Sequence, residues 1–104
     1  MERKAKYNTI VEKVGVEEVL AQLAEEASEL AQAALKMRRK ISGINPTPAT
    51  MRICSDNFTE EMADVFLCLE ILGATSRAKE INDIKEYKLN RWLDRLSEVR
   101  EDAE

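Results

Sequence analysis

Four acidic residues in two separate stretches of the chain have the spacing of a metal site. Glu26 and Glu29 are three positions apart, and so are Glu61 and Asp64. On a helix, residues three apart lie on neighbouring turns of one side, so each pair presents two carboxylates together. If the two helices pack antiparallel, all four carboxylates meet at one point, where their repulsion requires a cation. Oxygen ligands of this kind favour a hard divalent ion, which we expect to be Mg²⁺ or Mn²⁺.

The second acidic pair lies within the most apolar stretch of the chain, residues 60–72. At helical spacing, this region forms one apolar stripe, which consists of Phe58, Met62, Val65, Phe66, Leu69 and Leu72. Carboxylates beside such a stripe lose hydration, and without a cation that loss is unfavourable. The alternative is that the acids are ordinary solvated side chains. That alternative fits Glu25, a weaker candidate for an outer-shell or base role, better than it fits the two pairs.

Basic residues near the end of the chain supply complementary charge. Lys88 falls within an apolar stripe that includes Ile81 and Trp92, and Arg91 lies at the margin of that stripe. Lys and Arg beside a metal commonly bind phosphoryl oxygens, so Lys88 and Arg91 are candidates for phosphate binding. Pairing with the protein's own acids is the alternative, and the sequence leaves it open. The basic run at residues 36–40 fits a helix C-terminus, where it compensates the helix dipole, better than a ligand site.

Composition limits the class of protein. The chain has 104 residues, which suits a single domain over residues 1–104, and its net charge of −4 argues against binding to a nucleic-acid polymer. No apolar run is long enough to span a membrane, so we expect a cytoplasmic protein in which Cys54 and Cys68 are reduced thiols. The absence of histidine excludes histidine-ligated zinc and histidine-dependent catalytic triads. Chemistry must therefore depend on carboxylates, lysine and arginine.

Helical periodicity over most of the chain predicts an all-α fold, a bundle of about four helices of which one is short and three are long. The expected helices cover residues 1–14, 17–40, about 56–72 and about 76–100, and a loop over residues 41–57 contains both prolines. Gly15 ends the first helix, Ser55 or Asp56 caps the third, and Thr75 or Ser76 caps the last.

The third helix is also apolar on the side opposite to its stripe, at Leu67 and Ile71. A helix that is apolar nearly all round must be covered nearly all round. We expect a second copy of the chain to complete this cover.

Three segments of the chain form a recognisable pattern. They are Leu-Ala-Glu-Glu-Ala-Ser-Glu-Leu at residues 23–30, Glu-Glu-Met-Ala-Asp-Val at residues 60–65 and Lys-Leu-Asn-Arg at residues 88–91. Together they resemble the MazG-like, all-alpha nucleoside triphosphate pyrophosphohydrolases, over most of residues 16–96. The interval between the acidic motifs, residues 30–60, is longer than is usual in that family, and we attribute the extra length to the proline-containing loop.

The resemblance implies a function and a site. In that family the Glu-x-x-Glu and Glu-x-x-Asp carboxylates bind Mg²⁺, which implies Glu26, Glu29, Glu61 and Asp64 as metal ligands and catalytic residues here. Family members cleave nucleotides between the alpha and beta phosphates, which implies a (d)NTP substrate and (d)NMP and pyrophosphate as products. They commonly assemble as dimers or tetramers, with sites built near subunit contacts.

Two other functions are compatible with the same residues. The chain could be a non-catalytic helical oligomerisation module in which the acids pair with Lys88 and Arg91. It could also be a pyrophosphohydrolase that acts on a phosphoribosyl nucleotide.

Overall fold

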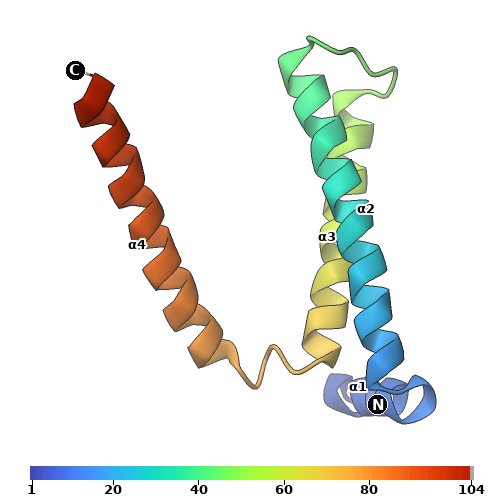
Figure 1. Cartoon of the computed structure of the whole chain (residues 1–104). Coiled ribbons are helices and arrows are strands. Elements are labelled where there is room, and N and C mark those ends of the chain that lie inside the picture. The colour runs from blue at the N-terminus through green and yellow to red at the C-terminus, as the bar shows by residue number, and fades with distance from the viewer. Residues whose placement is uncertain (104) are drawn as a thin grey trace. The chain divides into compact units, whose positions relative to one another are not determined.

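The structure is a computed structural model that describes the backbone of residues 1–103 and the side chains of residues 1–98. Over this range the chain is helical, without strands, as the periodicity predicted (Figure 1). The helices are α1 (Arg3–Val14), α2 (Val16–Ser42), α3 (Met51–Ile71) and α4 (Ala78–Ala103). The chain divides into two compact units, residues 1–72 and the residues from Gly73 onward. A single domain over residues 1–104 stays a prediction.

The first unit is a hairpin of α2 and α3, which lie side by side and run in opposite directions (Figure 1). Its most buried side chains are small or of medium size: Val19 and Ala33 on α2, and Cys54 and Cys68 on α3. Small side chains at a helix contact let the two backbones approach closely. The two helices are thus antiparallel, as the predicted meeting of the carboxylates requires.

Helix α1 contacts both α2 and α3 at one end of the hairpin. The hydroxyl of Tyr7 donates a hydrogen bond to the Glu70 carboxylate near the end of α3. This hydrogen bond, together with burial and the negative charge of Glu70, raises the pKa of Tyr7. Gly15 ends α1 with a φ of 87°, as the sequence predicted, and α2 begins at the next residue.

Helix α3 begins earlier than predicted. Its N-cap is Thr50, whose Oγ1 accepts a hydrogen bond from the Ile53 backbone N–H at 3.2 Å, so the predicted caps Ser55 and Asp56 are wrong and lie inside the helix. The first turn of α3 mixes half-exposed apolar residues with polar ones. Its sequence therefore shows no apolar stripe at helical spacing from which the start could be predicted.

The loop is correspondingly shorter than the predicted one and covers residues 43–50. Gly43 ends α2 in the left-handed conformation, with a φ of 67°, and Thr50 starts α3 two positions after Pro48. Most of the interval between the acidic motifs, residues 30–60, is thus helix, and that the loop accounts for its extra length stays a prediction. Over the described residues, none of the helices has the length and hydropathy that a membrane-spanning segment needs.

In the second unit, a run of turns separates the start at Gly73 from helix α4, which begins at Ala78. The predicted caps Thr75 and Ser76 are therefore wrong. The Ser76 hydroxyl instead donates to the Gly73 carbonyl at 2.8 Å, and the Thr75 carbonyl accepts from the Ala78 N–H at 3.3 Å. These bonds belong to the turns, so neither side chain caps the helix.

The N-cap of α3 gives the first testable prediction. Thr50→Ala should lower the free energy of unfolding by about 1 kcal/mol, because the Ile53 N–H loses its side-chain acceptor. Urea denaturation followed by circular dichroism measures the change. Ser55→Ala is the matched control and should change stability by no more than about 0.5 kcal/mol, since Ser55 is exposed inside the helix. A larger loss for Ser55→Ala than for Thr50→Ala would contradict the observed cap.

Candidate metal centre

Three of the four predicted acids meet between α2 and α3. Glu26 and Glu29 on α2 and Glu61 on α3 each place one carboxylate oxygen so that the three oxygens lie within 4.8 Å of one another. Oxygens bound to one Mg²⁺ at about 2.1 Å lie no more than about 4.2 Å apart, so a spread of up to 4.8 Å is slightly wider than a bound ion would give. Small side-chain rotations would bring the three oxygens into that range.

The fourth predicted acid, Asp64, lies outside this three-residue cluster but next to it. It is half-buried and follows Glu61 by about one turn of α3. Its negative charge contributes to the raised pKa of both Glu26 and Cys68, which places its carboxylate near these side chains. The structure therefore brings three of the acids together and puts the fourth at the edge of the cluster.

Two oxygens of the cluster are buried without a hydrogen-bond partner. They are Oε2 of Glu26 and Oε2 of Glu61, whereas Oε1 of Glu26 accepts a hydrogen bond from Nε2 of Gln22 at 2.7 Å. Leaving a buried charged oxygen without a partner is costly, and native structures contain few such groups. Within the described residues, no lysine or arginine forms an ion pair with these carboxylates. The donor set therefore fits a cation that binds oxygen.

The electrostatics of Glu26 reflect this crowding. The hydrogen bond from Gln22 is the largest single influence and lowers the pKa of Glu26. Burial and the negative charges of Glu29 and Asp64 together outweigh it, so the pKa of Glu26 is raised above its ordinary value. The same crowding reaches Cys68, whose pKa is raised by burial and by the charges of Glu26 and Asp64.

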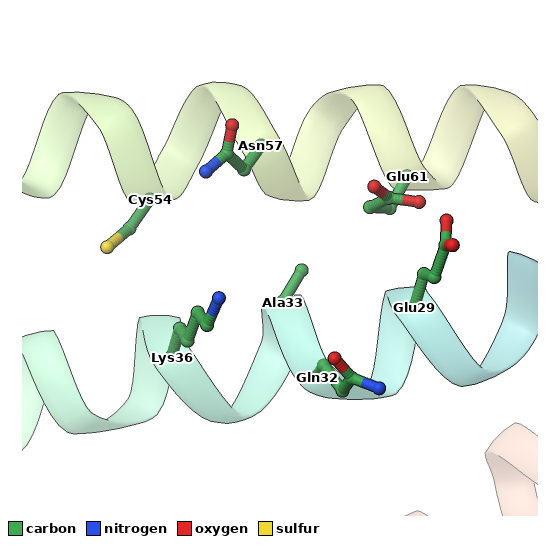
Figure 2. A pocket seen from close by; sticks show the side chains of 7 residues that line it. All are labelled: Glu29, Gln32, Ala33, Lys36, Cys54, Asn57 and Glu61. Carbon is green, nitrogen blue, oxygen red and sulfur yellow. The ribbon is translucent and has the colours of Figure 1, made fainter. Parts of the chain in front are cut away.

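A groove of about 380 Å³ extends from the acids along the contact between α2 and α3 (Figure 2). It is lined by Glu29, Gln32, Ala33 and Lys36 on α2, and by Cys54, Asn57 and Glu61 on α3. The volume lies within the range of small-molecule sites. The cluster is thus one end of a larger concave surface.

Sequence reasoning missed Lys36 as a residue of this site. It was assigned to the basic end of α2, yet it follows Glu29 by seven positions, which is two turns and hence the same side of the helix. That spacing was the available signal, but the three basic residues that follow, Arg38, Arg39 and Lys40, made Lys36 look like part of a basic helix end.

The remaining candidates are not among the residues of the cluster or of the groove. Lys88 and Arg91 are exposed on α4, in the second unit, where the Arg91 guanidinium lies 5.7 Å from the centroid of the Tyr87 ring. Their role in phosphate binding stays a prediction. Glu25 is exposed on α2 and is not part of the cluster.

Comparisons with known proteins identify no relative. The chain matches no family model, and no curated protein or solved structure shows significant similarity to it.

The raised pKa of Glu26 gives a second prediction. The folded protein holds this proton more tightly than the unfolded chain, so metal-free stability falls as pH rises from about 4.5 through the raised pKa. Glu26→Gln removes the cost of ionising this side chain in the folded protein and keeps an acceptor for the Gln22 amide. We expect the variant to have a higher Tm than the wild type at pH 7 in a chelator, and the gain to shrink as the pH falls below about 4.5.

The control for this measurement is Glu25→Gln, the same charge change at an exposed neighbour outside the cluster. Its Tm should stay near that of the wild type across the pH range. A gain for Glu26→Gln that is the same at every pH would show that repulsion within the cluster is not its cause.

Proposed function

We propose that the chain is a metal-dependent nucleotide pyrophosphohydrolase, which cleaves a (d)NTP between the alpha and beta phosphates to give (d)NMP and pyrophosphate. The observation that carries the proposal is the cluster of three carboxylates with two buried, unpartnered oxygens, at the end of an open groove. The resemblance of the acidic motifs to those of the MazG-like family supports the choice of substrate.

The residues that would hold Mg²⁺, or Mn²⁺, are Glu26, Glu29, Glu61 and Asp64. When bound, the ion would lower the pKa of a coordinated water and neutralise charge on the phosphates. The protein's own part is to fix the direction of the ligands. The hydrogen bond from Gln22 holds one oxygen of Glu26 and leaves the other, Oε2, free to coordinate.

Hydrolysis adds one water across the anhydride between the alpha and beta phosphates. The oxygen of the water bonds to the alpha phosphorus, the bond to the bridging oxygen breaks, and pyrophosphate leaves. A phosphoribosyl nucleotide with a triphosphate offers the same bond and the same leaving group. A panel of dNTPs, NTPs and phosphoribosyl nucleotides, assayed for release of pyrophosphate or of monophosphates, identifies which of these the protein accepts.

Metal binding is tested separately from turnover. We expect Mg²⁺ to raise the Tm of the wild-type protein, because it binds only the folded cluster, and Glu61→Gln or Asp64→Asn to reduce this shift and to abolish Mg²⁺-dependent pyrophosphate release. Differential scanning calorimetry with and without Mg²⁺ measures the shift. Glu60→Gln, an exposed neighbour of Glu61, is the matched control and should keep both properties. Unchanged turnover in both Glu61→Gln and Asp64→Asn would defeat the proposal.

A second candidate function, a non-catalytic oligomerisation module, is favoured by one observation. Phe66 and Leu67 on α3 are 60% and 47% exposed, and large exposed apolar side chains on a helix commonly mark an interface. A homodimer or homotetramer that covers these two side chains is compatible with either function. A Tm that does not respond to Mg²⁺ would favour the module without catalysis.

The oligomeric state has its own test. Phe66→Ser should shift the protein toward a smaller species in sedimentation velocity, because it removes apolar surface from the proposed interface. Ile44→Ser is the control, since Ile44 is 89% exposed in the loop and away from α3. A wild-type protein that sediments as a monomer at all concentrations would exclude this assembly.

A further inference from the structure

We infer that Lys36 binds a phosphate of the ligand, so that the phosphate chain runs along the groove from the carboxylate cluster toward Lys36. The inference rests on the proposed function and adds a residue and a direction to it. It differs from the sequence-based prediction, which assigned phosphate binding to Lys88 and Arg91.

The position of Lys36 is the first argument. It lies two turns after Glu29, about 10 Å farther along α2, and Figure 2 shows its side chain extending from α2 into the gap toward α3. Lys36 is the one cationic residue among the described residues that line the groove. The groove is therefore anionic at one end, where Glu29 and Glu61 lie, and cationic toward the other.

The availability of its charge is the second argument. Lys36 is exposed, and within the described residues it forms no ion pair with Glu29, Glu61 or any other acid. Its ammonium group has three donors and acts as a compact point charge, which suits phosphate oxygens. A phosphate chain that contacts a cation at the carboxylates would meet this second positive charge in the same groove.

The rest of the lining favours phosphate over a nucleobase. None of the described residues that line the groove is aromatic, so the groove offers no surface on which a base would stack. Its floor is made by Ala33 and Cys54, which are small and buried. Asn57 faces the groove from α3, and its amide provides further donors for phosphate oxygens (Figure 2).

The test measures binding of inorganic pyrophosphate by isothermal titration calorimetry in the presence of Mg²⁺. Lys36→Met removes the charge and keeps most of the stem, and should weaken binding by about tenfold or more, because a charge-assisted contact is lost. Lys36→Arg keeps the charge and should retain most of the affinity. Lys4→Met makes the same change at an exposed position of α1 and should bind as the wild type does.

Two further readouts separate this inference from the proposed function. Lys36→Met should keep the Tm increase caused by Mg²⁺ alone, because Lys36 is not a metal ligand, and its unchanged circular dichroism spectrum would show that it folds. Pyrophosphate affinity that is equal in Lys36→Met and wild type, or a wild type that does not bind pyrophosphate, would overturn the inference. A Tm that does not respond to Mg²⁺ in the wild type would instead count against the proposed function.

Discussion

Repulsion among carboxylates at the contact of α2 and α3 is the constraint on which the rest of the first unit depends. Glu26, Glu29 and Glu61 bring like charges within 4.8 Å, and two of their oxygens are buried without a partner. The most buried side chains of this contact, such as Ala33 and Cys68, are small and contribute little apolar burial each. The hairpin thus lacks part of the stability that a larger buried core would give.

The groove that begins at this crowded cluster carries opposite charges at two separated points, so it can orient a charged ligand. Negative charge is concentrated at the end of the groove where Glu29 of α2 and Glu61 of α3 lie, and Lys36 adds positive charge two turns farther along α2. A divalent ion bound at the acids would change the electrostatic potential from negative to positive only at the end of the groove near Glu29 and Glu61. A ligand with several phosphates would then meet attraction at two separated points, which fixes its orientation better than one contact does.

Much of the architecture follows from the sequence alone. Periodicity identified the all-helical fold and the pairing of acids on each helix, because these features depend on spacing within single helices, and the glycine at position 15 identified the end of α1. That three of the four acids meet depends in addition on the antiparallel packing of α2 and α3. The starts of α3 and α4 were wrong, because a cap depends on which side chain reaches a backbone N–H, and several Ser and Thr residues compete near each start. Lys36 was missed since its neighbours at residues 38–40 are also basic, and only the packing of α3 distinguishes it from them.

The loop between Gly43 and Thr50 lies at the far end of the hairpin from α1, and about three and a half turns of α2 separate it from Glu29. Each helix carries its acids on its own rigid backbone, so the register of α2 against α3 is what fixes their meeting. Insertions or deletions in the loop can be accommodated locally as long as that register is kept. The connection is thus free to diverge in length and composition, whereas a single added residue within either helix would rotate one set of carboxylates away from the other by about 100°.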